Sequence, residues 1–469
     1  MPDPLAAPED VLPALELVLE RARAYMAELD GPVRTPAADE AARSFVAELP
    51  EEGSGTLAAV RELLERGTEA HVRSGGPRFF HWVIGGSTPA ALAADWFASL
   101  IDQNAGWWDS SPLATQLEAV SLAWLQELFG LPAAWGGALT TGATTANFTA
   151  LAAARQWWGE RHGVDVAARG LAGLPPVSVL TSGFVHVTSL KALAMLGIGR
   201  DQVTYCQADE TGRLDLAGLE RELKRLGGAP AIVIANAGEV NAGHFDPIAE
   251  MSGLAREHGA WLHVDGAFGL FARVSPRTAA LAEGVDRADS VISDGHKWLN
   301  VPFDCGFAFV RDPALLTAVF SASASYLPEE EVFAFRSPEL SRRARSLAVW
   351  ATLAAYGRSG YRALVERSLD VAAHVVREVE AADDLELLAP APLNIVCFRY
   401  RPSGVPEEAL DELNLAIGRA VLTDGRVYVG TTRWACTVGF RPAFVNWRTT
   451  TADADLMLET VRDLGRRLA

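Results

Sequence analysis

The stretch Ser290-Val291-Ile292-Ser293-Asp294-Gly295-His296-Lys297-Trp298-Leu299-Asn300 places one lysine just after a short apolar run. The run predicts a short strand, and Lys297 falls on the turn that follows it. Asp294 and His296 precede this lysine, and Trp298 follows it. A partly desolvated lysine amine is a good nucleophile toward carbonyl groups and forms Schiff bases. The stretch therefore predicts a reactive lysine at the end of a strand.

Short apolar runs alternate with Ala/Leu-rich segments on both sides of this stretch, from residue 77 to residue 358. We expect strands at 177–181, 203–206, 231–235, 261–264, 290–293 and 306–310. We expect helices at 88–103, 113–129, 145–158, 187–196, 214–226, 247–258 and 312–320. This alternation predicts an α/β fold with a large, mainly parallel sheet, whose ligands bind at the carboxyl ends of the strands.

The two ends of the chain follow other patterns. Helical spacing over 8–29 and 56–72 predicts an N-terminal helical arm within residues 1–76, which either packs on a partner subunit or caps the fold. A long helix is expected at 338–380. Beyond it, strands at 393–400, 427–430 and 434–440 and helices at 406–421 and 452–468 predict a smaller C-terminal α+β domain. The expected domains are 1–76, 77–358 and 359–469.

The charge of the chain limits its partners. Forty-one basic and fifty-nine acidic side chains give a net charge of −18, which repels phosphate backbones and anionic lipid surfaces. The apolar runs are shorter than a membrane span, and the N-terminus lacks a basic, apolar signal segment. We therefore expect no nucleic-acid partner, no membrane association and a cytoplasmic location. The four cysteines and nine histidines show no metal-ligand spacing, so we expect buried free thiols and no metal.

Three further segments carry candidate chemistry. Residues 139–147, Leu-Thr-Thr-Gly-Ala-Thr-Thr-Ala-Asn, lead into an Ala-rich helix whose N-terminus is suited to a phosphate, although a plain helix cap has the same pattern. Asp265 ends an expected strand and can hold a pyridine nitrogen protonated, or can simply cap the next turn. His186 opens another helix, where an imidazole can stack on a planar cofactor or cap the helix.

The order and spacing of these segments resemble the group II pyridoxal phosphate-dependent decarboxylases, the family of aromatic-L-amino-acid, histidine and glutamate decarboxylases. The resemblance runs from about residue 77 to the C-terminus. It implies the PLP-dependent transferase fold, fold type I, which is similar to aspartate aminotransferase. It also implies a homodimer whose sites are completed by both subunits.

The resemblance implies roles for individual residues. Lys297 would carry pyridoxal 5'-phosphate, Asp265 would pair with its ring nitrogen, and His186 would stack on its ring. The other residues implied in cofactor binding are Gly142, Ala143, Thr144, Asn241, Ala267, Asp294 and His296. Those implied in substrate binding are Phe79, Trp107 and Arg441.

One segment departs from the family pattern. Family decarboxylases carry a loop tyrosine that protonates the substrate carbon after carbon dioxide leaves. Here residues 327–340 contain Phe333 and Phe335 but no tyrosine, and the nearest tyrosine is Tyr326. A phenyl ring cannot donate a proton. In relatives with phenylalanine at that place, oxygen reacts instead and an aldehyde is released.

The sequence therefore favours a PLP-dependent amino-acid decarboxylase that forms an amine and carbon dioxide. Aromatic residues near the expected pocket favour an aromatic or apolar substrate side chain. The alternatives are a decarboxylation coupled to oxidative deamination, another PLP reaction such as transamination, or a dimer without catalytic activity.

Overall fold

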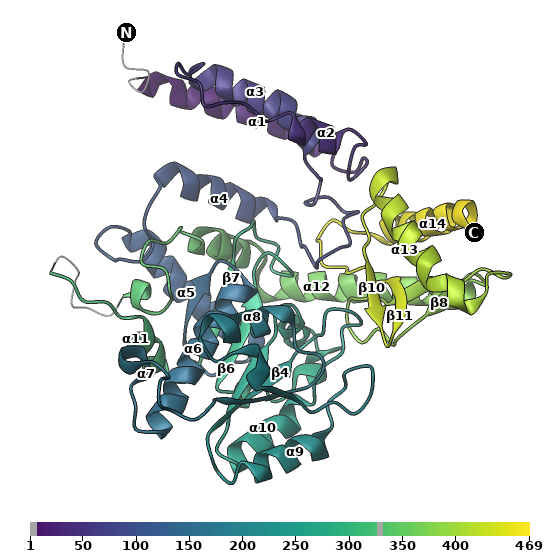
Figure 1. The fold of residues 1–469 in the computed structure, drawn as a ribbon. Coiled ribbons are helices and arrows are strands. Elements are labelled where there is room, and N and C mark those ends of the chain that lie inside the picture. The colour runs from purple at the N-terminus through teal and green to yellow at the C-terminus, as the bar shows by residue number, and fades with distance from the viewer. Residues whose placement is uncertain (1–6, 326–331) are drawn as a thin grey trace.

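A seven-stranded sheet forms the centre of the molecule in a computed structural model that describes residues 7–325 and 332–469 (Figure 1). The strand order is β1-β7-β6-β5-β4-β2-β3. β7 runs antiparallel to β1 and β6, and the other pairs are parallel. The strands are β1 Gly136–Thr140, β2 Ser178–Thr181, β3 Val203–Tyr205, β4 Ala231–Asn236, β5 Trp261–Asp265, β6 Ser290–Asp294 and β7 Gly306–Val310. The predicted α/β fold with a mainly parallel sheet is confirmed.

Helices cover both faces of this sheet, which explains why its strands are so apolar. All six residues of β4, Ala-Ile-Val-Ile-Ala-Asn, are buried, as expected for a parallel strand covered on both sides. One face packs against α6 (Ala143–Arg161), α8 (Val187–Met195) and α11 (Ala314–Phe320). The other packs against α5 (Pro112–Phe129), α9 (Leu216–Arg225) and α10 (Ile248–Glu257).

The carboxyl ends of the parallel strands meet at one edge of the sheet. Asn236 at the end of β4 is in register with Asp265 at the end of β5. Asp294 at the end of β6 pairs with Gly306, and Gly306 also pairs with Thr140 at the end of β1. The predicted functional segments therefore begin at neighbouring places in space.

Strand β1 was not predicted, because its sequence Gly-Gly-Ala-Leu-Thr begins with two glycines and has a single β-branched residue, Thr140. Its glycines are required by close packing. A Cβ at Gly137 would lie 2.3 Å from the carbonyl oxygen of Ala308 on β7, and a Cβ at Gly136 would lie 2.3 Å from Pro313. The glycines weaken the strand signal in the sequence and at the same time permit the pairing.

A four-stranded antiparallel sheet of order β10-β11-β9-β8 follows in the C-terminal part of the chain. It is reached through α12 (Ser346–Ala381), which is interrupted at Gly357, where φ is 58° and ψ is −172°. Its strands and covering helices are β8 Leu385–Leu387, β9 Phe398–Tyr400, α13 Glu407–Asp424, β10 Thr431–Trp434, β11 Thr437–Phe440 and α14 Thr451–Leu468.

Two strand predictions in this part were wrong. Residues 427–430 form no strand, and Tyr428 makes only an isolated bridge to Phe79. Residues 434–440 are not one strand, because Ala435 and Cys436 turn the chain with φ values of 43° and 67°. This turn joins β10 and β11 into a hairpin.

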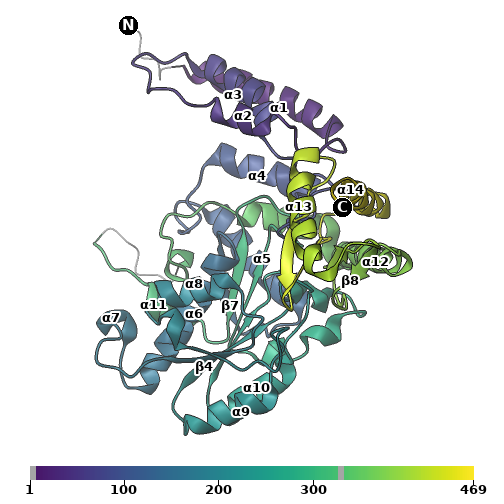
Figure 2. The same ribbon diagram turned by 45° about the vertical axis from the view of Figure 1, so that its right-hand side comes forward.

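The N-terminal helices form an arm that lies across α4 (Pro89–Ile101), as Figures 1 and 2 show. Neither α1 (Val11–Ala27) nor α3 (Thr56–Ala70) contains a buried residue. Short helices complete the chain: η1 Pro8–Asp10, α2 Ala38–Arg43, α7 Val166–Arg169, η2 Arg200–Gln202, η3 Gly269–Val274, η4 Ala279–Ala282, η5 Val285–Arg287 and η6 Phe333–Phe335. Within the described ranges, no helix is long and apolar enough to cross a membrane.

Candidate active site

Lys297 lies on the turn after β6, directed back toward the end of that strand. Its Nζ is 3.1 Å from Oδ2 of Asp294, and the two side chains are 16% and 3% exposed. The same Nζ lies 5.9 Å from the ring centroid of Phe268. The amine is thus mostly buried and paired with one carboxylate.

The backbone of the lysine turn is clamped from two sides. Gly85 donates its N–H to the carbonyl oxygen of His296 at 3.0 Å. A Cβ at Gly85 would lie 1.8 Å from the carbonyl oxygen of Lys297, so only glycine fits there. Asn300, at φ 55°, donates from Nδ2 to the carbonyl oxygens of Lys297 and Val445 at 3.2 and 2.9 Å. These contacts hold Lys297 at a fixed place.

His296 has a defined tautomer. Its Nδ1 lies 3.1 Å from the carbonyl oxygen of Cys305, which can only accept, so Nδ1 carries the proton. Burial lowers the pKa of His296, although Asp294 works in the opposite direction. Phe303 stacks on the imidazole with ring centroids 4.2 Å apart. A neutral ring with its Nε2 unprotonated therefore lies beside Asp294.

The N-terminus of α6 meets the lysine turn at Gly142. This residue is the N-cap of α6 and, as a glycine, supplies no side-chain cap of its own. Ala143 donates its N–H to Oδ1 of Asp294 at 2.5 Å. A Cβ at Gly142 would lie 3.3 Å from Cε1 of His296. Thr144, in the first turn, is half-buried. The glycine leaves a cradle at a helix N-terminus that is suited to an anion.

Asp265 is buried at the end of β5 and is surrounded by donors. Its Oδ2 accepts from Nδ2 of Asn147 at 2.9 Å and from Oγ of Ser189 at 3.0 Å. Its Oδ1 accepts from the N–H of Ala267 at 3.2 Å. Burial works to raise the pKa of Asp265, but His186, Asn147 and other neighbours outweigh burial and hold that pKa below its ordinary value. The carboxylate is therefore ionised.

His186 is the N-cap of α8 and lies close to Asp265 and Lys297. Its Nδ1 accepts from the N–H of Thr188 at 3.3 Å and lies 2.8 Å from Oγ1 of that residue. Burial lowers the pKa of His186, Asp265 raises it, and Lys297 lowers it further. Thr188, which contacts His186, and Asp265 both contact the amide group of Asn147. The structure thus brings together the three residues around which the sequence analysis was built.

Arg441 adds a cation to the same site. It is 5% exposed, and its Nη1 is buried without a hydrogen-bond partner within the described part of the chain. Burial lowers the pKa of Arg441 to about 10, while Glu239 raises it. The charge of Arg441 also lowers the pKa of His186. An unpaired guanidinium N–H group next to His186 is a ready-made donor for a carboxylate.

Glu239 was not identified from the sequence as a site residue. It is 4% exposed and accepts the N–H of Asn241 at 2.8 Å, together with the N–H of Ala242. Burial raises the pKa of Glu239, and Arg441 lowers it. The site therefore holds a third buried carboxylate besides those of Asp265 and Asp294.

The remaining predicted residues have other contacts. Oδ1 of Asn241 accepts from Oγ1 of Thr432 on β10 at 2.5 Å, which ties its loop to the small sheet. Phe79 packs on Tyr428 with centroids 4.8 Å apart. Trp107 packs edge-on against Phe335 at 5.5 Å. Phe79 and Trp107 thus lie in separate aromatic clusters of one chain.

Asn147 and Ser189 were also missed as site residues. Asn147 lies in an Ala-rich helix and Ser189 in the first turn of another, and both are fully buried. A buried polar residue on the sheet-facing side of an alanine-rich helix is a usable signal, because such a side chain needs a partner. The identity of that partner comes only from the fold.

The conserved domain of pyridoxal-dependent decarboxylases matches residues 46–401. The chain belongs to this family. A Rhizobium meliloti L-2,4-diaminobutyrate decarboxylase is 34% identical over 433 residues, which cover 90% of this chain and 84% of the relative. A mouse acidic amino acid decarboxylase, GADL1, is 30% identical over 84% of this chain and 74% of the relative.

Solved structures agree with this assignment. The crystal structure of Oryza sativa TDC with PLP and tryptamine has a TM-score of 0.90 and 25% identity, over 98% of both chains. The protein is a PLP-dependent amino-acid decarboxylase.

The residues present fit pyridoxal phosphate. The glycine cradle at the N-terminus of α6 is suited to the phosphate, and the ionised Asp265 to the protonated ring nitrogen. Lys297 supplies the amine that reacts with the aldehyde. The neutral His296 beside the cradle adds no charge to an anion site.

Proposed function

We propose that this decarboxylase acts on an L-amino acid with an aromatic or apolar side chain and releases the amine and carbon dioxide. The observation that carries the proposal is the buried Arg441, whose Nη1 has no hydrogen-bond partner within the described residues, with the buried Glu239 near enough to raise its pKa. The guanidinium of Arg441 is available for the α-carboxylate of the substrate, and the negative charge of Glu239 acts on it. An acidic side chain would need a second cation at the site.

Individual residues have distinct tasks in this proposal. Lys297 would hold the cofactor through its mostly buried amine. Bound pyridoxal phosphate supplies an electron sink for the pair that remains when carbon dioxide departs. Asp265 holds the proton on the ring nitrogen, because its own pKa is held low. Arg441 orients the α-carboxylate through its unpaired Nη1.

A substrate screen tests the proposal. The protein loaded with pyridoxal phosphate is incubated with the common amino acids and with L-2,4-diaminobutyrate, and carbon dioxide, amine, aldehyde and hydrogen peroxide are quantified. We expect equal amounts of carbon dioxide and amine from an aromatic or apolar amino acid. Turnover restricted to acidic amino acids or to diaminobutyrate would overturn the substrate assignment. Lys297→Ala is the matched control and should lose the visible absorbance of the lysine-bound cofactor.

The absence of tyrosine from residues 327–340 favours a second product outcome. Without a loop phenol, the proton for the substrate carbon would come from His186, from water or from Tyr326, which lies outside the described residues. If oxygen reacts first, the products are an aldehyde, ammonia, carbon dioxide and hydrogen peroxide. Peroxide formed in equal amount to carbon dioxide would establish this outcome, and a keto acid without carbon dioxide would indicate transamination.

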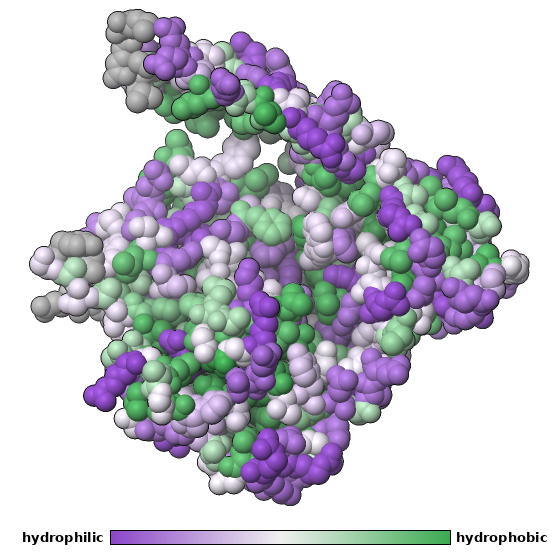
Figure 3. Space-filling model, in the orientation of Figure 1, coloured by the Kyte–Doolittle hydropathy of each residue, from purple (hydrophilic) through white to green (hydrophobic). Residues whose placement is uncertain are grey.

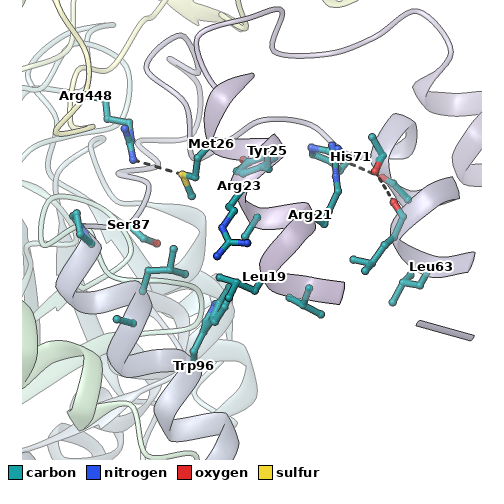
Figure 4. Close-up of a pocket in the computed structure, with 18 residues that line it drawn as sticks. Leu19, Arg21, Arg23, Tyr25, Met26, Leu63, His71, Ser87, Trp96 and Arg448 are labelled. Atoms are coloured by element: carbon teal, nitrogen blue, oxygen red, sulfur yellow. Dashed lines mark hydrogen bonds between the residues drawn. The ribbon is translucent and has the colours of Figure 1, made fainter. Parts of the chain in front are cut away.

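We also propose that the protein is a homodimer joined in part through the N-terminal arm. Figure 3 shows a hollow between the arm and the body. This crevice has a volume of about 1040 Å³ and is lined mainly by apolar side chains. Leu19 and Met26 of α1 and Trp96 of α4 lie around it and remain more than 40% exposed (Figure 4). Helices with no buried residue are not stabilised by one chain alone, which supports a second copy as the missing partner.

Light scattering after size exclusion tests the dimer. We expect a particle of twice the 50.2 kDa chain mass. Leu12→Glu places a charge on the exposed apolar side of α1, where the leucine is 70% exposed, and should weaken the dimer. Glu16→Gln on the same helix is the control. A wild-type protein of single-chain mass at micromolar concentration would contradict the proposal.

We propose an intracellular, reducing location, and within it the cytoplasm. All four cysteines are free thiols; Cys206, Cys305 and Cys397 are buried, as predicted, but the prediction was wrong for Cys436, which is exposed. Free thiols are typical of compartments kept reduced. Fractionation of the native host with an antibody to the chain tests this location.

A further inference from the structure

The carboxamide of Asn147 contacts three residues on two other elements of the site. Its side chain is completely buried in α6. Nδ2 lies 2.9 Å from Oδ2 of Asp265 and 3.3 Å from Oγ1 of Thr188. Oδ1 lies 2.8 Å from Nε2 of His263. One side chain therefore joins β5 to the start of α8.

The hydrogen bonds from Asn147 to Asp265 and His263, which form the first branch of the network, allow only one assignment of donors and acceptors. A carboxylate accepts and an amide nitrogen donates, so Asn147 donates to Asp265 and its Oδ1 must accept from Nε2 of His263. Burial lowers the pKa of His263 to about 4, so its ring is neutral and its Nδ1 is an acceptor. Ser290 Oγ, 2.8 Å from Nδ1, donates to it and accepts from Nε1 of Trp261 at 3.0 Å. The network is directed from Trp261 to Asp265.

The second branch runs from Asn147 through Thr188 to His186 and determines which ring nitrogen of His186 carries the proton. The remaining N–H of Asn147 donates to Oγ1 of Thr188, which turns the threonine hydroxyl proton toward Nδ1 of His186 at 2.8 Å. The backbone N–H of Thr188 also donates to this Nδ1. Nδ1 is thus an acceptor, and the proton of the neutral ring is on Nε2.

We propose that Asn147 is a positioning residue that orients the Asp265 carboxylate and at the same time selects the Nε2–H tautomer of His186. The inference rests on the proposed function, in which Asp265 and His186 act on the cofactor and substrate. Its consequence is that both groups are prepared before any ligand binds: Asp265 as an ionised acceptor and His186 as an N–H donor.

The chemistry of the site demands asparagine at this position. Aspartate would place a second carboxylate within 3 Å of Asp265, where like charges repel strongly. Leucine has nearly the same shape and no polar atom. Glutamine is one methylene longer and has no room in a side-chain position that is 0% exposed. Of these residues, only asparagine supplies one acceptor and two donors at this reach.

Three variants separate the contacts that reach Asp265 from the contact that reaches His186 through Thr188. Asn147→Leu removes both, and Asn147→Ser, which is too short to reach all three partners, replaces it if the leucine variant does not fold. Thr188→Val removes only the hydroxyl that donates to His186. Ser189→Ala removes only the other donor to Oδ2 of Asp265.

The first measurement uses the cofactor-free protein labelled with ¹⁵N-histidine. Nitrogen chemical shifts report the tautomer of His186, whose signals are identified by their loss in His186→Gln. We expect the Nε2–H tautomer in the wild type. The ratio of the Nδ1–H to the Nε2–H tautomer should rise about fivefold in Asn147→Leu and Thr188→Val, as expected for loss of one hydrogen bond, and stay constant in Ser189→Ala.

The second measurement uses the loaded enzyme and follows kcat and the visible absorbance of the cofactor against pH. Loss of a donor raises the pKa of Asp265, so the acid limb should shift upward by about one pH unit in Asn147→Leu and Ser189→Ala, but not in Thr188→Val. A merely structural role would lower thermal stability and leave both readouts at wild-type values, which would overturn the proposal. The tautomer measurement needs no cofactor, so it remains decisive even if no amino acid is decarboxylated.

Discussion

Nζ of Lys297 lies 3.1 Å from Oδ2 of Asp294, and Oδ1 of the same carboxylate accepts the N–H of Ala143 at 2.5 Å. One buried side chain therefore connects the reactive lysine to the first turn of α6. It joins residues 290–300, which are expected to form the Schiff base, to residues 139–147, which are expected to bind the phosphate. Asp294 thus has a structural task and an electrostatic one, and the two can be separated.

Asp294→Ala and Asp294→Asn separate these tasks. Both variants remove the charge that faces Lys297, but asparagine keeps an oxygen that can accept from Ala143. Leaving a buried N–H without a partner costs about 1–3 kcal/mol. We expect the free energy of unfolding of the cofactor-free alanine variant to be lower than that of the asparagine variant by about this amount, measured in urea. Equal losses would show that Ala143 finds another acceptor.

Glu239→Gln tests how the site rejects acidic substrates. The change removes a buried carboxylate whose negative charge raises the pKa of Arg441. We expect kcat/KM for glutamate or aspartate to rise at least about tenfold relative to that for the best aromatic substrate, since an unfavourable like-charge contact is removed. Asp246→Asn is not a suitable control because that carboxyl binds Asn236. Glu257→Gln, on the surface of α10, is suitable, and a similar ratio change there would argue against a local effect.

The sequence predicted the residues whose chemistry is visible locally. Lys297 and Asp265 end apolar runs, and His186 opens a helix, so each could be placed at the carboxyl edge of a parallel sheet. The seven-stranded sheet was predicted apart from β1, whose glycines hide its strand character.

The supporting residues could not be predicted, since their partners are remote in the chain. Asn147 contacts Asp265 and His263, which are more than one hundred residues away in the sequence. The pKa of Glu239 is likewise lowered by Arg441, a residue from a distant part of the chain. The place of Asn147 on an alanine-rich helix indicates that its side chain needs a partner, but the sequence does not identify that partner. The short strands of the small sheet were misplaced for a related reason. Residues 427–430 have the composition of a strand, but their only strand-like pairing within the described residues is the bridge from Tyr428 to Phe79.

Protonation of His263 should destabilise the protein at mildly acidic pH. Its pKa falls from 6.5 in the unfolded chain to about 4 in the folded protein, because the ring is buried. Between these values the unfolded chain binds a proton that the folded protein excludes. The corresponding stability is fully present above pH 6.5 and is lost as the pH falls toward 4, by about 3 kcal/mol in total.

His263→Gln measures this contribution. Glutamine does not titrate, so unfolding free energies from urea melts should fall less steeply between pH 6.5 and 4 than in the wild type. His81 has a pKa lowered to about 4 by burial and by Arg441, so part of the slope should remain. In the double variant with His81→Gln, the free energy of unfolding should depend even less on pH over this range. A slope unaffected by either change would mean that neither ring is the titrating group.

Phe333→Tyr asks whether a phenol at this position can protonate the substrate. The ring of Phe333 is 9% exposed and packs in the main hydrophobic core, with the Arg336 guanidinium 5.1 Å from its centroid. A hydroxyl added there enters the core, at a cost of about 1–3 kcal/mol. We expect lower thermal stability, with the ratio of hydrogen peroxide to carbon dioxide unchanged within about twofold, because a buried phenol has no path to the substrate carbon.

Phe335→Tyr is the matched control, since this ring is also buried and packs against Trp107. Peroxide and carbon dioxide are measured together for the wild type and both variants with the same substrate. If Phe333→Tyr alone suppresses peroxide while carbon dioxide release continues, Phe333 must leave the core during turnover and reach the site. The absence of a tyrosine at position 333 would then be sufficient to decide whether the enzyme releases the aldehyde or the amine. If neither variant changes the ratio, the proton reaches the substrate carbon from elsewhere, and the Nε2–H group of His186 is the donor to examine next.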